Sequence, residues 1–230
     1  MSSINFIGGE KGGVGKSVTA RLLAQYFIDR NRLFAGFDTD RSHGSFRRFY
    51  EGFASPVVVD SFEGLDAIAN GFEANPHQSA IVDLAAQTLQ PLAEWIGASD
   101  LLQVLQELGV AVNFWHVMDD GKDSTDLLAT LLERFGQGPG YIVVKNQGRG
   151  GDFAVFHASP AMAKALEFGA KIITLPRLHD ASMRKMDATN VSFWKAINDR
   201  STPGALGLLE RQRVKNWLAQ VYTAFDTLPL

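Results

Sequence analysis

The sequence has 230 residues, a formal net charge of −3 and no cysteine, with 46% apolar and 20% charged residues. This composition is ordinary for a globular protein, and the length fits one domain spanning residues 1–230. The lack of cysteine excludes disulfides, thiolate zinc sites and cysteine-bound iron–sulfur clusters, and the slightly acidic charge excludes a general attraction to nucleic acid.

No segment of the sequence indicates export or membrane insertion. The N-terminus enters a strand-like run at once, without the basic, apolar and small-residue order of a signal peptide. No run approaches the roughly 18 apolar residues of a membrane span. We therefore expect a cytoplasmic protein that makes no contact with a membrane.

Apolar runs of strand length alternate along the chain with segments of helical periodicity. We expect strands at 3–7, 33–38, 56–60, 79–83, 110–117, 140–145 and 170–175. We expect helices at 15–30, 43–52, 63–73, 88–95, 98–108, 123–136, 159–168, 180–198 and 204–225, with N-caps at Ser99-Asp100 and Asp123-Ser124. This alternation predicts an α/β fold with a doubly wound, mostly parallel sheet and helices on both faces. Ligands of such sheets bind beyond the carboxyl ends of the strands, so functional motifs are expected there.

A glycine-rich segment follows the first expected strand and opens the first expected helix. Residues 8–17 read Gly-Gly-Glu-Lys-Gly-Gly-Val-Gly-Lys-Ser. Glycines let backbone N–H groups approach a phosphate closely, and a helix N-terminus favours an anion. In a phosphate-binding loop of this kind, Lys16 reaches the β- and γ-phosphates and Ser17 binds Mg²⁺. The residues expected to contact the nucleotide are Gly12, Gly13, Val14, Gly15, Lys16, Ser17 and Val18.

The loop departs from the ordinary pattern at two neighbouring positions. Glu10 stands where the first glycine of G-x-x-x-x-G-K-[ST] should be, and a second lysine, Lys11, follows it. The run from Lys11 to Ser17 closely resembles the deviant phosphate loop of the ParA/MinD ATPases. This resemblance implies a Mg²⁺- and ATP-dependent ATPase that forms a homodimer, in which Lys11 reaches across the interface to the partner's nucleotide. The alternative is a glycine-rich turn that carries lysines by chance.

Two carboxylates follow the second expected strand. Asp38 and Asp40 lie two positions apart, so both leave the strand end on the side of the phosphate loop. A magnesium–nucleotide site needs one acid near the water shell of the metal and another near the attacking water. The pair resembles the Asp-x-Asp segment of the same family. This implies that Asp38 belongs to the Mg²⁺ shell and that Asp40 orients the hydrolytic water; a solvated turn is the alternative.

Polar residues also follow the fourth, sixth and seventh expected strands. An apolar run that ends in Asp83 forms a Walker B pattern, so Asp83 is expected to hold Mg²⁺ through a water. The next residues, Ala85-Ala86, depart from the family, and Gln87 is a candidate contact of the γ-phosphate. The Asn146 amide can pair with an adenine edge, as the resemblance also implies, or it can serve a turn. In members of this family, a proline-containing loop after the seventh strand lies against the base. The resemblance therefore implies that Pro176 contacts the base.

Three further segments resemble the conjugative-plasmid TraL/StbB branch of these ATPases. They are residues 38–46, residues 83–92 and the Arg-Gln-Arg-Val-Lys stretch at 211–215. In the first of them, Arg41 and His43 replace the proline and asparagine of the branch. The resemblance implies a role in plasmid transfer or stable inheritance, together with a partner protein.

The last expected helix carries one apolar stripe with the spacing of a buried helix face. The stripe consists of Val214, Trp217, Leu218, Val221, Tyr222 and Phe225. We expect it to pack onto the sheet rather than to bind a membrane. Arg211, Arg213 and Lys215 on the same helix form either a solvated face or a contact with the DNA backbone, which would be independent of DNA sequence.

Two functions therefore compete on the sequence alone. The first is a dimerising ATPase that acts as a molecular switch in plasmid partition, stability or conjugative transfer. The second is a nucleotide-dependent DNA- or protein-binding module with negligible hydrolysis, which Ala85-Ala86 favours because it departs from the family. A metabolic ligase on the same fold would need a second small-molecule pocket, and the sequence contains no motif for one.

Overall fold

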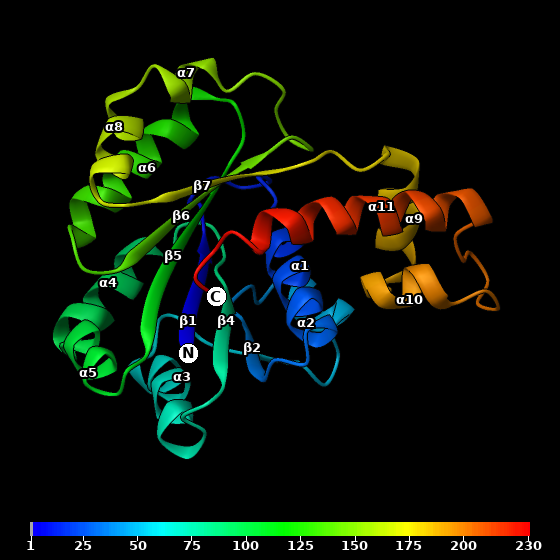
Figure 1. Cartoon of the computed structure of the whole chain (residues 1–230). Coiled ribbons are helices and arrows are strands. Elements are labelled where there is room, and N and C mark those ends of the chain that lie inside the picture. The colour runs from blue at the N-terminus through cyan, green and yellow to red at the C-terminus, as the bar shows by residue number, and fades with distance from the viewer. Residues whose placement is uncertain (1) are drawn as a thin grey trace.

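The computed structural model describes residues 2–230, and a seven-stranded sheet forms its centre (Figure 1). Its strands are β1 (Ser3–Gly8), β2 (Phe34–Asp38), β3 (Ala54–Pro56), β4 (Ser79–Asp83), β5 (Ala111–Met118), β6 (Gly140–Asn146) and β7 (Lys171–Leu175). They lie in the order β3-β2-β4-β1-β5-β6-β7, and every neighbouring pair is parallel. The central β1 therefore has β4 on one side and β5 on the other.

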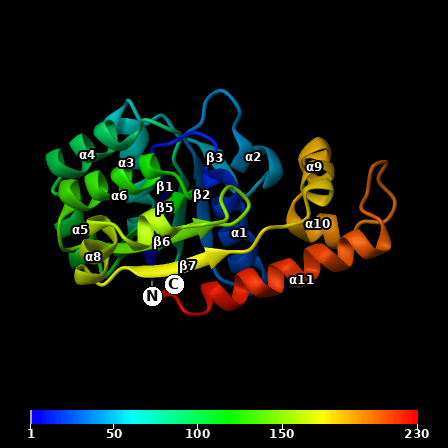
Figure 2. The ribbon, with the colours of Figure 1, turned by 90° about the horizontal axis from the view of Figure 1, so that it is seen from above.

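Helices cover both faces of the sheet (Figures 1 and 2). On one face pack α1 (Lys16–Asp29), α2 (Ser45–Phe49), α9 (Asp180–Thr189), α10 (Phe193–Asn198) and α11 (Leu208–Phe225). On the other pack α3 (Phe62–Ala74), α4 (Leu89–Ala98), α5 (Leu101–Glu107), α6 (Lys122–Phe135), α7 (Ala154–His157) and α8 (Pro160–Glu167). This arrangement confirms the predicted doubly wound, parallel α/β fold.

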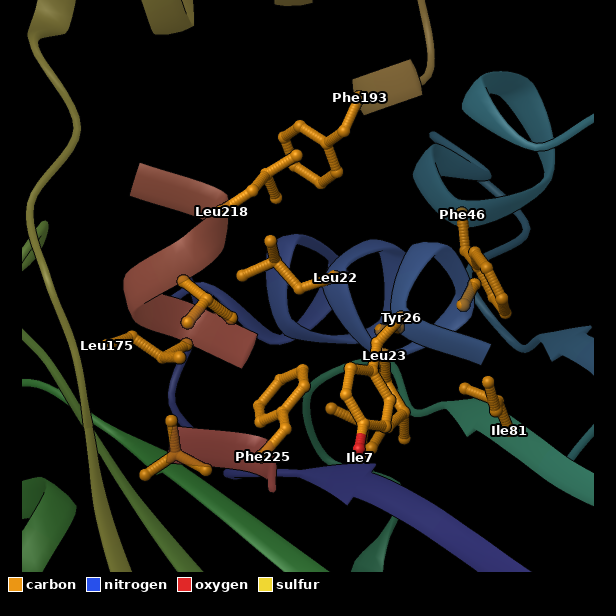
Figure 3. Packing of buried hydrophobic residues seen from close by; sticks show 14 of the residues in the cluster. Ile7, Leu22, Leu23, Tyr26, Phe46, Ile81, Leu175, Phe193, Leu218 and Phe225 are labelled. Carbon is orange, nitrogen blue, oxygen red and sulfur yellow. The ribbon is translucent and has the colours of Figure 1, made fainter. Parts of the chain in front are cut away.

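Successive residues of the strands contribute their side chains alternately to two separate hydrophobic cores, one on each face of the sheet. Ile4 and Phe6 of β1 point into the core under α3–α8, whereas Ile7 points into the core under α1 and α11. All three side chains are fully buried, which explains why the strand reads as a continuous apolar run. Figure 3 shows the core under α1 and α11, in which Leu22 of α1 lies between the sheet and Leu218 of α11.

The apolar stripe of α11 packs against the sheet and α1, as predicted. Val214, Leu218 and Phe225 are buried in the core that they share with α1. Tyr222 lies at the edge of this core and donates a hydrogen bond from its hydroxyl to Asp29 Oδ2 at 2.6 Å. No helix within residues 2–230 combines the length and apolar character that crossing a membrane requires.

A buried polar network crosses the three central strands. The side-chain Oδ1 of Asn5 accepts from Asn113 Nδ2 at 3.2 Å and from Trp115 Nε1 at 3.0 Å. Its Nδ2 donates to Ser3 Oγ at 3.0 Å and to the Ala80 carbonyl at 3.3 Å. Asn5 is completely buried, so its amide is the hydrogen-bonding partner of several groups that water cannot reach.

We expect Asn5→Ala to lower the free energy of unfolding by about 2–3 kcal/mol, because it leaves the buried Trp115 and Asn113 donors unpaired. Urea denaturation monitored by tryptophan fluorescence measures the change. Asn216→Ala is the matched control, since Asn216 is exposed on α11 and its side chain accepts a hydrogen bond from the exposed Gln212. Equal midpoints for the two variants would contradict the prediction.

The third strand differs from the prediction at 56–60. β3 ends at Pro56, and Val57 to Asp60 form a connection in which Val58 is 39% exposed. The apolar run does not extend the strand because Ser61 caps α3 immediately afterwards by accepting from the Gly64 amide at 3.2 Å. A side chain at position 64 would come within 2.5 Å of the Val58 carbonyl, so the connection packs directly on the helix backbone.

The helix predicted at 180–198 is two helices. α9 ends at Thr189, where the C-cap Asn190 takes a left-handed conformation with φ 49°, and Ser192 then caps α10 by accepting from the Lys195 amide. The predicted N-caps also require correction. Asp100 precedes α5 but caps it with no side-chain hydrogen bond, and α6 begins at Lys122, before Asp123-Ser124. The short helix α7 was not predicted.

Candidate functional site

The glycine-rich segment forms a tight loop between β1 and α1. Gly13 and Gly15 have positive φ values of 78° and 105°, and Gly15 is the N-cap of α1. A side chain at position 15 would collide with the Asn146 amide, so glycine is required there for both conformation and space. The loop therefore presents the start of α1, with its unpaired N–H groups, to any bound anion.

Lys16 is folded into this loop. Its ammonium donates to the carbonyls of Gly9 at 2.8 Å and Lys11 at 2.9 Å, and the residue is 8% exposed. Burial lowers the pKa of Lys16, although the carboxylates of Asp83 and Glu10 oppose this shift. The ammonium thus lies inside the loop and close to any phosphate group that the loop binds.

The loop borders a cavity of about 640 Å³, a volume typical of small-molecule sites. Its lining combines the phosphate loop with the connections after β2, β4 and β6 and with residues of α1, α2 and α9. The lining residues are Gly12, Gly13, Gly15, Lys16, Ser17, Val18, Arg21, Asp40, His43, Ser45, Arg48, Phe49, Asp83, Leu84, Ala85, Ala86, Arg149 and Asp187. Six of the seven predicted loop residues, all except Val14, lie in it together with Asp40 and Asp83.

Asp83 ends β4 beside Ser17 and has both carboxylate oxygens buried. Within residues 2–230, neither oxygen has a hydrogen-bond partner, although the Ser17 hydroxyl is close enough to lower the pKa. Burial is the largest influence and, with the charge of Asp38, it raises the pKa of Asp83 to about 7. A buried carboxylate without a partner is unfavourable unless a cation or water satisfies it.

These residues fit a magnesium ion held mainly by a nucleotide. Asp83 and Ser17 supply oxygen donors, which Mg²⁺ prefers, next to the phosphate loop. No group of three or more histidine or acidic side chains within residues 2–230 could hold a metal by itself. Mg²⁺ usually keeps waters and phosphate oxygens as most of its ligands, so a two-residue protein contribution suits it.

The Asp38 carboxylate holds the connection after β2 in shape. Its Oδ1 accepts from the Asp40 amide at 3.0 Å, and its Oδ2 accepts from the Arg47 amide at 2.9 Å. The side chain is buried, so both oxygens organise backbone between the strand and α2. A place in the Mg²⁺ shell remains a prediction for Asp38. Asp83 is better suited to that place, because neither of its carboxylate oxygens has a hydrogen-bond partner within residues 2–230.

The Asp40 carboxylate lies at the cavity and is bonded to its own loop. Its Oδ1 accepts from the amides of Ser42 at 2.8 Å and His43 at 3.1 Å. Partial burial favours the neutral acid, but these amides and the His43 side chain hold the pKa of Asp40 below its usual range. Asp40 is therefore an anion that can orient a water, and its catalytic role remains a prediction.

Asn146, at the end of β6, braces the phosphate loop. Its Nδ2 donates to the Val14 carbonyl at 2.7 Å, and its Oδ1 accepts from the Gly148 amide at 2.9 Å. The amide keeps one further hydrogen and one further lone pair, which leaves the predicted contact with adenine open. Asn146 is not among the described residues that line the cavity.

The loop after β7 is attached to the C-terminal helix. Trp217 Nε1 of α11 donates to the Pro176 carbonyl at 2.6 Å. Pro176 is also not among the described lining residues, so its contact with a base remains a prediction. The hydrogen bond shows how α11 positions this loop, a tertiary contact that no local pattern could predict.

Lys11 turns away from Lys16 toward the connection after β5. Its ammonium lies 2.8 Å from Asp119 Oδ2 and 4.0 Å from Asp123 Oδ2. The Asp119 hydrogen bond raises the pKa of Lys11. Although partial burial favours the neutral acid, Lys11 and Ser124 hold the pKa of Asp119 below its usual range. Both groups are therefore charged, and Lys11 is held within its own chain.

Glu10 turns in the opposite direction, toward α4. Its Oε1 accepts from the amides of Thr88 at 3.2 Å and Leu89 at 3.1 Å, at the start of that helix. Burial raises the pKa of Glu10, while the two amides and Lys16 lower it. The residue that replaces the first glycine of the usual pattern thus has a defined structural partner.

Arg21 is a cavity residue that the sequence interpretation missed. Its guanidinium carbon lies 3.9 Å from the centre of the Phe49 ring, and its Nη1 lies 3.4 Å from Asp187 Oδ1. The available signal was its spacing, because position 21 follows Ser17 by one helical turn and shares its face. Asp187 and Phe49 join the cavity only through tertiary packing, so local sequence carried no signal for them.

No protein-family model matches the sequence. It is 22% identical to protein TraL of Escherichia coli, with 98% of each chain covered. It is 24% identical to protein MobD of Acidithiobacillus ferrooxidans, with 86% of this chain and 87% of the relative covered.

Two solved structures share the fold over nearly the full length of both chains. The cell division protein MinD of Aquifex aeolicus superimposes with a TM-score of 0.53 at 12% identity, covering 96% of this chain and 97% of its own. A protein assigned to plasmid partition from Borrelia burgdorferi, bound to AMPPNP, gives a TM-score of 0.51 at 12% identity, covering 99% and 100%. The predicted resemblance to ParA/MinD-type ATPases near the TraL branch is confirmed by these two kinds of similarity together.

Proposed function

We propose that this chain is a Mg²⁺-dependent ATPase that dimerises on binding ATP and acts as a molecular switch in plasmid partition, stability or conjugative transfer. The observation that carries the proposal is the cavity of about 640 Å³, where the phosphate loop meets Asp83. The similarity to TraL and MobD, and the fold shared with a plasmid partition protein, support a plasmid-related role.

Each residue in the proposed site has a role that its chemistry allows. The backbone N–H groups of Gly13 and Gly15 bind phosphate oxygens, and Lys16 neutralises the β- and γ-phosphates. Ser17 and Asp83 would hold Mg²⁺, which would supply positive charge next to the phosphates. Asp40 lies at the cavity wall as an anion and orients the attacking water.

Dimerisation supplies the remaining positive charge. Phosphoryl transfer depends on positioning and on charge stabilisation, so a cation brought by a second copy can control the rate. We propose that Lys11 supplies this cation to the partner's nucleotide after it leaves Asp119. Hydrolysis is then slow in the monomer and linked to assembly, which suits a switch better than a metabolic enzyme.

The proposal is tested by measuring phosphate release and molar mass on the same samples. With ATP and Mg²⁺, we expect slow turnover and a dimer by light scattering; with ADP, or with ATP and EDTA, we expect a monomer and no turnover. A monomer in ATP that still hydrolyses it would contradict the switch. No binding of a fluorescent ATP analogue would contradict the nucleotide site itself.

The competing function is a nucleotide-dependent binding module that scarcely hydrolyses ATP. The hydrogen bonds that tie Asp40 to its own loop, together with Ala85-Ala86 at the cavity wall, favour it. Arg213 and Lys215 are exposed on α11 and are the residues that we propose for non-specific DNA contact. Phosphate release that rises on adding DNA would rule out this second function, whereas ATP-dependent DNA binding without release would favour it.

A further inference from the structure

The start of α4 is capped by a residue from a distant part of the chain. The nearest local candidate, Thr88, donates its hydroxyl to the Ala85 carbonyl at 2.9 Å and makes no cap hydrogen bond. The first N–H groups of a helix need acceptors, and the Glu10 carboxylate accepts from two of them. A negative charge at this end of a helix is also favoured by the helix dipole.

Glu10 and Lys11 attach the phosphate loop to the connections on both sides of β1. Because β1 lies between β4 and β5, consecutive residues after β1 can reach the connection after each neighbour. Glu10 reaches Thr88 and Leu89 after β4, and Lys11 reaches Asp119 after β5. The backbone of this segment is also held in place, since the Lys11 carbonyl accepts a hydrogen bond from the Lys16 ammonium.

The β4–α4 connection (residues 84–88) is therefore held at both ends. At its start, the Thr39 hydroxyl accepts from the Ala85 amide at 2.8 Å and donates to the Asp83 carbonyl at 3.0 Å. At its end, Glu10 holds Thr88 and the first residue of α4. Between these points, Ala86 lies at the cavity wall, and Gln87 is exposed with a positive φ of 63°.

We propose that Glu10 is a positioning residue that couples the phosphate loop to α4, so that nucleotide in the loop sets the conformation of the β4–α4 connection. This inference rests on the proposed nucleotide site. It adds a path by which nucleotide binding changes the position of α4, on the face of the sheet opposite α1. Glu10 acts through backbone amides and does not contact the nucleotide. When the loop adjusts to phosphate, its carboxylate carries the movement to the start of α4.

The test is hydrogen–deuterium exchange of residues 84–98 with and without AMPPNP and Mg²⁺, in the full chain. In the wild type, we expect AMPPNP to slow exchange in this segment. In Glu10→Ala, AMPPNP should still bind within about threefold of the wild-type affinity, but exchange in 84–98 should no longer respond to it. Glu10→Gln keeps an oxygen acceptor and should restore the response. Glu94→Ala, which removes an exposed carboxylate of α4 bonded to Gln90, should respond as the wild type does.

Steady-state kinetics separate coupling from a merely structural cap. Glu10→Ala should lower kcat by about tenfold with KM nearly unchanged, because the connection is displaced while binding is kept. Glu10→Gln should recover most of kcat. An unchanged nucleotide response in Glu10→Ala, or no response in a wild type that binds AMPPNP, would overturn the coupling alone. A wild type that does not bind AMPPNP would overturn the nucleotide site, and with it this inference.

Discussion

Lys11→Ala is expected to lower ATP turnover by about 10²- to 10³-fold and to leave nucleotide binding to the monomer within about threefold of the wild type. Cations supplied by a partner to a transferring phosphoryl group have effects of this size or larger. The structure explains why monomer binding should survive, since the ammonium of Lys11 is directed to Asp119, away from the ammonium of Lys16. Phosphate release and titration with a fluorescent ATP analogue measure the two quantities.

The ion pair of Lys11 with Asp119 is weak enough to be exchanged. The two side chains are 32% and 18% exposed, and partly exposed pairs of this kind contribute little to stability because water screens them. A triphosphate carries more negative charge than one carboxylate and can attract the lysine when a second copy approaches. Asp119 can therefore hold the Lys11 side chain in the monomer without preventing its transfer to a partner's nucleotide.

Lys122→Ala is the matched control for Lys11→Ala. Lys122 is an exposed lysine at the start of α6, and its ammonium pairs with Asp126 on the same helix. Loss of this charge should leave turnover and ATP-dependent assembly unchanged. Normal hydrolysis by Lys11→Ala would show that the sandwiched dimer is wrong, and equal losses in both variants would point to a general charge effect.

The fold and the position of the site were predictable because they depend on local patterns. Buried parallel strands read as apolar runs, and the ends of β1, β2, β4 and β6 carry the glycine loop, Asp38, Asp83 and Asn146. The β3 prediction failed because apolarity alone does not distinguish a strand from a buried connection. The run of valines at 57–59 packs beside α3 without extending the sheet.

The contacts within the site were less predictable because they join residues far apart in the chain. Glu10 caps α4 from 78 positions away, and Trp217 reaches Pro176 across 41 positions. The amide of Asn146 and its place after a strand predict a polar contact, yet only the packed structure reveals its hydrogen bond to Val14. Sequence patterns indicated which residue types were present at the sheet edge, and packing decided their partners.

Asp83→Asn is expected to remove a large pH dependence of stability from the nucleotide-free protein. Burial raises the pKa of Asp83 from 3.8 to about 7, so the folded state binds a proton that the unfolded state releases between these values. Stability from this group is present in full below about pH 4 and is lost as pH rises through about 7. At about 1.4 kcal/mol per pKa unit, the loss is on the order of 4 kcal/mol.

Urea denaturation of both proteins between pH 4 and 8 measures this difference. The advantage of Asp83→Asn over the wild type should grow across that range, because the neutral amide carries no buried charge at any of these pH values. Mg²⁺ and ATP should stabilise the wild type more than the variant, since they supply the cation that the buried carboxylate lacks. A parallel loss of stability in both proteins would show that another group causes it, and equal stabilisation by Mg²⁺-ATP would remove Asp83 from the metal site. A gain in apo stability combined with a loss of ligand response would mean that the nucleotide-free protein sacrifices stability at Asp83 in order to bind the metal.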